Sequence, residues 1–96
     1  METTFKNEAL SGEIEVVSNN LKVSSNYFID KESNKIQKIE SGQLIKDRTS
    51  TGWFSASKEG DKLTYNFSGI TLGEVTEFEP LLEEMELQIN NKAKEV

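Results

Sequence analysis

The chain has 96 residues, a hydrophobic fraction of 34% and a net charge of −6, which together indicate one small domain with a thin core. It contains no cysteine and no histidine, so disulfides, thiolate sites and Ser-His-Asp or Cys-His catalysis are excluded. The first residues are polar without a signal-peptide segment, and no apolar run approaches membrane-spanning length, so we expect a cytoplasmic protein.

Charge is divided unevenly along the chain. Residues 1–70 contain 10 acidic and 9 basic side chains, whereas residues 71–96 contain 7 acidic and 2 basic ones. We therefore expect a single domain, residues 1–96, with a nearly neutral sheet part over 1–70 and an acidic helical part over 71–96. Direct nucleic-acid binding is not expected, because it needs a basic patch, and no membrane partner is expected either.

Three runs near the start alternate apolar and polar residues, which predicts strands with one buried face. The runs are Thr3–Leu10, Glu13–Ser18 and Leu21–Ile29. Their inward residues would be Phe5, Asn7 and Ala9, then Ile14 and Val16, then Leu21, Val23, Tyr27 and Ile29. Asn19-Asn20 suits a two-residue hairpin turn, because asparagine tolerates positive φ, and this turn would place Val16 opposite Val23.

The segment Ile36–Ile45 combines two kinds of spacing. Ile36 and Ile39 are three residues apart, which fits a helix better than a flat strand. Ser41-Gly42 interrupts the run, and glycine within a strand often marks a bulge. We interpret the segment as a bent strand that follows a polar connection at 30–34 and precedes a polar loop over 46–51.

The stretch Gly52–Gly69 predicts the hairpin around which the rest of the sheet is built. Apolar and polar residues alternate in its second half, and 59–61 supply turn chemistry. A two-residue turn at 59–60 would pair Phe54 with Tyr65, whereas one at 60–61 would pair Phe54 with Phe67. Both registers place the same apolar residues on one face: Phe54, Ala56, Leu63, Tyr65 and Phe67.

Trp53 lies on the opposite face of this hairpin if Phe54 points inward. A three-residue loop would exchange the two, because a slip of one residue flips every side chain to the other face; we favour Phe54 inside. Tryptophan is highly buried on average, so we expect another element to cover Trp53. The alternative is that Trp53 is exposed and anchors a partner.

After Gly69 the apolar spacing changes to that of a helix. One stripe with steps of three and four residues contains Val75, Phe78, Leu82, Met85 and Ile89. We predict a helix from about Glu77 to about Lys92, with glutamates near its start and lysines near its end, as the helix dipole favours. This helix should lie across the apolar face of the sheet.

The start of the helix has several candidate signals. The sequence offers two alternative capping boxes, Thr71 with Glu74 and Thr76 with Glu79. Pro80 fits best in the first turn, where its missing N–H does least harm, or at a kink after a short helical turn. The predicted elements together give an α+β fold: an antiparallel β-meander of about five to six strands followed by one C-terminal amphipathic helix packed on the sheet.

No motif for a metal, phosphate or nucleotide is complete. Gly69 and Gly73 lack the lysine and the serine or threonine of a phosphate loop. The acidic pairs at 30/32 and 59/61 do not fit the EF-hand calcium loop, and we interpret them as turns. No cofactor and no metal site are predicted, and without histidine or cysteine we expect a protein that is not an enzyme.

The glutamates of the helical segment are the least ordinary feature. Six fall within thirteen residues: Glu74, Glu77, Glu79, Glu83, Glu84 and Glu86. One interpretation is a solvated face that keeps the protein in solution. The other is a docking surface for a basic partner protein, as in small acidic proteins of phages and mobile elements that inhibit host enzymes, an analogy of size and charge.

We therefore predict a small non-enzymatic protein-binding or accessory module that acts through the acidic helix, the aromatic sheet face around Trp53, or both. The candidate partner-binding residues are Trp53, Glu74, Glu77 and Glu84. The alternative function is a carrier or sensor of a small apolar ligand held between sheet and helix. The low apolar fraction also favours a homodimer.

Overall fold

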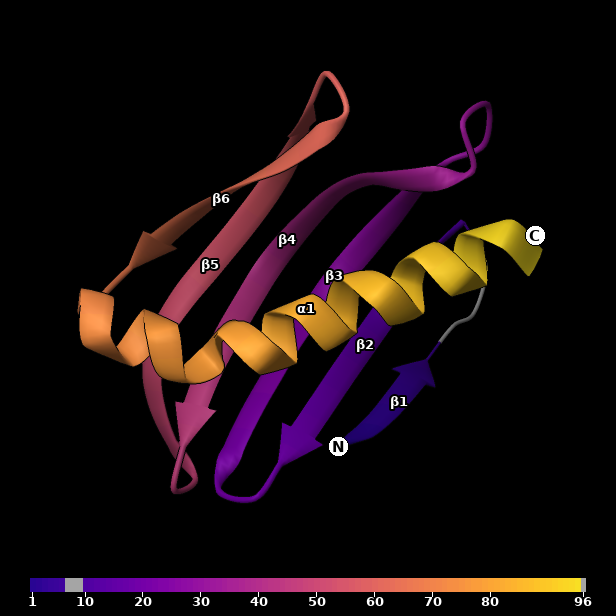
Figure 1. Cartoon of the computed structure of the whole chain (residues 1–96). Coiled ribbons are helices and arrows are strands. Elements are labelled where there is room, and N and C mark those ends of the chain that lie inside the picture. The colour runs from indigo at the N-terminus through magenta and orange to yellow at the C-terminus, as the bar shows by residue number, and fades with distance from the viewer. Residues whose placement is uncertain (7–9, 96) are drawn as a thin grey trace.

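The computed structural model describes residues 1–6 and 10–95, in which six strands precede one helix (Figure 1). The strands are β1 (Glu2–Lys6), β2 (Ser11–Ser18), β3 (Leu21–Asp30), β4 (Lys35–Lys46), β5 (Thr49–Glu59) and β6 (Lys62–Ser68), and the helix is α1 (Leu72–Glu95). Each strand pairs antiparallel with the next, so the sheet follows chain order. The predicted α+β meander with one C-terminal helix on the sheet is confirmed.

The core lies between α1 and one face of the sheet. The helix crosses this face diagonally and packs mainly on β2, β3 and β4 (Figure 1). The predicted stripe is buried from Phe78 to Ile89, and Val75 is partly buried. Burial of each large apolar side chain stabilises the fold by roughly 1.5–3 kcal/mol. Within the described residues, no helix is both long and apolar enough to cross a membrane.

The β2–β3 hairpin has the predicted register. Val16 is opposite Val23, and Asn19 has φ 56° in the two-residue turn. β1 includes residues 3–6 of the predicted first strand, and Asn7 and Ala9 lie outside the described residues. The inward Phe5 of β1 meets the ring of the buried Tyr27 edge to face, with centroids 5.8 Å apart.

β4 is the bent strand that the sequence predicts, and bulges explain its mixed spacing. Phe28 pairs with Lys38 while Ile29 pairs with Ile36, so β4 holds one extra residue here and both Ile36 and Ile39 face the core. A second register shift follows at 40–41, beside the glycine that was predicted to mark a bulge. The predicted polar loop over 46–51 is wrong, because β4 and β5 extend to a tight turn at 47–48.

The β5–β6 hairpin adopts the second of the two predicted registers. Phe54 pairs with Phe67, and the turn is Gly60-Asp61 with Gly60 at φ 64°. Phe54 is buried, but the three apolar residues of β6 are only partly covered, because the hairpin extends beyond α1 (Figure 1). The expectation that another element covers Trp53 is wrong: its side chain remains 49% exposed.

The helix begins at Leu72 rather than near Glu77. Thr71 and Glu74 form the first of the two predicted capping boxes, in which the Glu74 N–H donates to the Thr71 hydroxyl at 3.3 Å. The second box is wrong, because the Thr76 hydroxyl donates to the carbonyl of Leu72 inside the helix. Pro80 is in the helix interior and not in its first turn.

Candidate functional site

Trp53 stands on the open face of the sheet, the face that α1 does not cover. Alternation along β5 turns Phe54 and Ala56 toward the core and Trp53 away from it. Its cross-strand neighbours are Gln43 on β4 and Ser68 on β6. These side chains are polar and shorter than the indole, so they flank it without covering it.

Two shallow hollows mark the open face. One of about 210 Å³ adjoins Trp53 and includes Ser55, Asn66 and Ser68. The other, of about 330 Å³, lies toward β1 and has a lining of mixed charge and small polar groups. Its residues are Thr4, Lys6, Glu13, Ile14, Glu15, Ser24, Ser25, Asn26, Ser41 and Gln43. The open face therefore combines the exposed ring of Trp53 and the half-buried ring of Phe28, over which Lys38 lies, with many hydrogen-bonding groups. This arrangement is suited to a protein contact.

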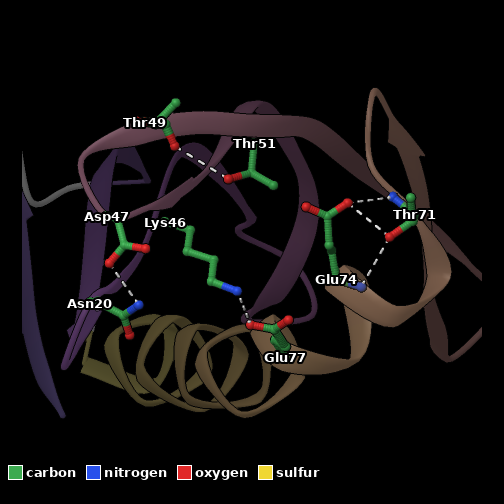
Figure 2. Close-up of polar contacts among 8 residues, drawn as sticks. All are labelled: Asn20, Lys46, Asp47, Thr49, Thr51, Thr71, Glu74 and Glu77. Atoms are coloured by element: carbon green, nitrogen blue, oxygen red, sulfur yellow. Dashed lines mark hydrogen bonds and ion pairs between the residues drawn. The ribbon is translucent and has the colours of Figure 1, made fainter.

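Two of the three predicted glutamates bond to residues outside α1 (Figure 2). Glu74 accepts hydrogen bonds from the Thr71 hydroxyl at 2.8 Å and the Thr71 N–H at 3.2 Å, which lower the pKa of its carboxyl. Glu77 accepts from Lys46 Nζ of β4 at 2.9 Å. This bond and the charge of Glu77 raise the pKa of Lys46. Both carboxylates therefore hold α1 to its surroundings.

Glu84 is partly buried and accepts a hydrogen bond from Gln88, one turn later in α1, at 3.3 Å. It belongs to the helix layer, whereas Trp53 is on the other side of the sheet. The structure therefore does not bring the four candidate residues into one surface.

A third feature, which the sequence analysis missed, is a groove of about 460 Å³ between α1 and the tip of the β5–β6 hairpin. We call it the lysine groove, because Lys35, Lys58, Lys62 and Lys94 line it. These residues come from three strands and the helix, so only the tertiary fold brings them together. Their positions in the sequence carry no local signal of this arrangement.

Glu86 lies at the wall of the lysine groove beside Tyr65. Burial raises the pKa of the Glu86 carboxyl, the Tyr65 hydroxyl lowers it and the charge of Glu83 adds a smaller increase. Burial and the neighbouring carboxylate also raise the pKa of Tyr65. Helical spacing places Glu86 next to Met85 at the flank of the apolar stripe, and this is the available sequence signal for its position.

The described residues were also compared with two other kinds of site, a metal site and an apolar ligand site between α1 and the sheet. Among residues 1–6 and 10–95, no three acidic side chains converge in a way that could hold a metal ion. The layer between α1 and the sheet is occupied by the side chains of Phe78, Leu82, Met85 and Ile89. The prediction of an apolar ligand carrier therefore stays a prediction that no particular contact favours.

No protein-family model, curated protein or solved structure matches this chain. Its function must therefore be inferred from the surfaces that the fold presents.

Proposed function

We propose that this protein is a non-enzymatic binding module that docks a partner protein on the open face of its sheet. The observation that carries the proposal is the exposure of Trp53, which is 49% accessible in the middle of β5. Tryptophan is enriched among residues that dominate binding energy, because it combines a large apolar surface with one hydrogen-bond donor.

The surroundings of Trp53 have the composition of an interface rim. Gln43, Ser55, Asn66 and Ser68 are uncharged, so a partner that covers the indole buries hydrogen-bonding groups and not isolated charges. The fitting partner surface is an apolar pocket with an acceptor for the indole N–H and with polar groups around it.

The glutamates of α1 have a different part in this proposal. Glu74 and Glu77 are engaged by Thr71 and Lys46, so they are poorly placed to form new close contacts. Their charge still adds to the net −6 of the chain. A field of that sign raises the rate of encounter with a basic partner even when the contact surface is elsewhere.

The test is a quantitative comparison of captured partners for three immobilised variants. Trp53→Ala should lose the specific partner, with affinity lower by at least about tenfold, as for a hot-spot tryptophan. Ser57→Ala, at an exposed position of the same strand, is the matched control and should retain it. Glu77→Gln/Glu84→Gln should slow association at low salt and leave the dissociation rate unchanged.

Urea unfolding of Trp53→Ala separates loss of binding from loss of fold. An exposed position should change the free energy of unfolding by less than about 1 kcal/mol. Retention of all specific partners by a folded Trp53→Ala protein would contradict the proposal.

A further inference from the structure

The lysine groove lies where two turns of the sheet and the C-terminal half of α1 approach one another. The β3–β4 turn and the tip of the β5–β6 hairpin are at the same end of the sheet (Figure 1). Ile36 and Leu63 contribute apolar surface to the groove, and its other lining residues are polar or charged. A volume of about 460 Å³ is within the range of small-molecule sites.

The lining of the groove has the opposite charge to the chain as a whole. Its four lysines are accompanied by two carboxylates, Asp61 and Glu86, so the lining has a net charge of +2 in a chain of net −6. The ion pairs of the described residues engage other lysines: Lys22, Lys38 and Lys46. The charge of the groove lysines is therefore available to an anionic ligand.

The hairpin tip alone does not account for this excess of positive charge. Its lysines and acidic residues balance over residues 58–62. Alternation along β5, however, turns Glu59 to the opposite face from Lys58, and Glu59 does not line the groove. Lys35 of β4 and Lys94 of α1 add positive charge from outside the hairpin.

Lys58 is a partly buried cation without an acidic partner in the described chain. It points to the same side of β5 as Phe54 and Ala56. Its Nζ donates to the Ser33 hydroxyl at 3.4 Å, which is a long hydrogen bond to an uncharged group. Partial burial removes water from the ammonium, and the hydroxyl does not replace that hydration with an opposite charge. An anion in the groove supplies the missing charge.

The wall that α1 contributes has different chemistry at its two ends. Glu86, Asn90 and Lys94 follow one another at intervals of four residues, so they line one side of the helix over about 12 Å. The ammonium of Lys94 suits a phosphate group, which lysine binds as a point charge. The carboxylate of Glu86 accepts hydrogen bonds when ionised, so it suits a group with hydroxyl donors.

We propose that the lysine groove binds a phosphate ester of a small hydroxyl-bearing compound, such as a sugar phosphate. The groove lysines hold the phosphate, and hydroxyl groups of the ligand donate to Glu86. A free phosphate ion occupies only the lysine end and leaves Glu86 without a sugar hydroxyl. The site is remote from Trp53, which is on the open face, so the proposal does not rest on partner docking there.

NMR titration of isotope-labelled protein with ribose phosphate, phosphorylated on the terminal hydroxyl, tests the site directly. Backbone amide signals of residues 33–36, 58–63 and 86–94 should shift, and those of β1 should not. Ribose without phosphate should cause no shift. Inorganic phosphate should bind at least about tenfold more weakly than ribose phosphate, because it lacks the hydroxyl contacts to a charged acceptor.

Two double variants with the same change of charge identify the lysines that bind. Lys58→Gln/Lys94→Gln should lower the affinity for ribose phosphate by at least about tenfold. Lys22→Gln/Lys38→Gln is the matched control, because both lysines are on the open face, where each is paired with a glutamate. At physiological salt this control should retain the affinity, since distant charges are screened. Circular dichroism checks that both variants fold.

Glu86→Met tests the hydroxyl end of the site. Removal of the carboxylate relieves repulsion of ribose phosphate and inorganic phosphate alike, so the ratio of their two affinities is the readout. This ratio should fall toward one.

Three results would overturn the proposal. The first is the absence of groove shifts up to roughly 10 mM ribose phosphate, where even a site with a millimolar dissociation constant is occupied. The second is an equal loss of affinity in the two lysine variants, and the third is an unchanged affinity ratio in Glu86→Met. Trp53→Ala should bind ribose phosphate as the wild type does, so failure of the groove and failure of partner docking are distinguishable.

Discussion

Gly42 shows how closely single residues are fitted in this fold. A Cβ atom at this position would lie 2.5 Å from ring carbons of Phe54, because the ring packs directly over the glycine. We therefore expect Gly42→Ala to lower the free energy of unfolding by about 1–3 kcal/mol, as overpacking does. Gly73→Ala is the control, because nothing beyond its chain neighbours and the nearby backbone of α1 lies within 4 Å of its Cβ position. A gain of up to about 1 kcal/mol is expected. Urea unfolding of both variants decides the matter, and equal effects would contradict the packing argument.

Glu86 provides a prediction about pH. Burial raises the pKa of its carboxyl above the ordinary value of 4.5 in the folded protein. Such a group favours the folded state below 4.5 and loses that contribution as the pH rises through its folded pKa. At neutral pH the ionised carboxylate therefore opposes folding. Glu86→Gln should raise the urea midpoint at neutral pH, and this gain should shrink when the pH falls below 4.5.

Tyr65→Phe is the companion variant for this measurement. The Tyr65 hydroxyl lowers the pKa of Glu86, so its removal should raise that pKa further and move the pH window of the Glu86 effect upward. A gain from Glu86→Gln that is the same at neutral and acidic pH would show that the carboxyl does not titrate with folding.

At the scale of elements, two threonines near the start of α1 were equally good candidates for the N-cap in the sequence. Thr71 and Glu74 form reciprocal hydrogen bonds at the helix terminus, whereas the Thr76 hydroxyl only bonds back to Leu72 within the helix. Thr71→Ala should cost about 1 kcal/mol, the usual value for loss of a cap. Thr76→Ala should be neutral or slightly stabilising, because alanine is the better helix former. Thermal unfolding of both variants measures the difference.

The same elements show which parts of the fold were predictable. The alternation around Val16 and Val23 and the helical stripe through Phe78 and Met85 were local signals, and both were correct. The predicted start of the helix was wrong, because the position of Pro80 suggested a helix terminus near that residue. In the structure, burial of the apolar stripe and the Thr71 cap fix an earlier start. Tertiary packing overrides such local preferences.

The candidate site was less predictable than the fold. Trp53 is exposed because α1 covers the opposite face of the sheet. Which face the helix covers is a property of the tertiary fold. The lysine groove depends on the strand register that brings residues from distant segments to the hairpin tip. No local pattern contains either kind of information.

At the scale of the molecule, burial is unequal between the centre and the β6 edge of the sheet. Phe78 has no exposed surface, whereas Phe67 is 36% exposed. Phe78→Ala should therefore cost about 3–5 kcal/mol. Phe67→Ala should cost clearly less, about 1–2 kcal/mol, because part of its ring already contacts water. Urea unfolding compares them, and equal losses would mean that the edge is as well packed as the centre.

The agreement between strand order and chain order also bears on how the chain folds. Each strand pairs with its sequence neighbour, so every hairpin closes a short loop. The helix must instead return to early strands, as in the hydrogen bond from Ser25 to the sulfur of Met85, 60 residues away. Longer loops cost more entropy to close, so we expect the hairpins to form before α1 docks. Until then the apolar face of the sheet is open to water, and the folding chain is most exposed to aggregation in the interval before its last element arrives.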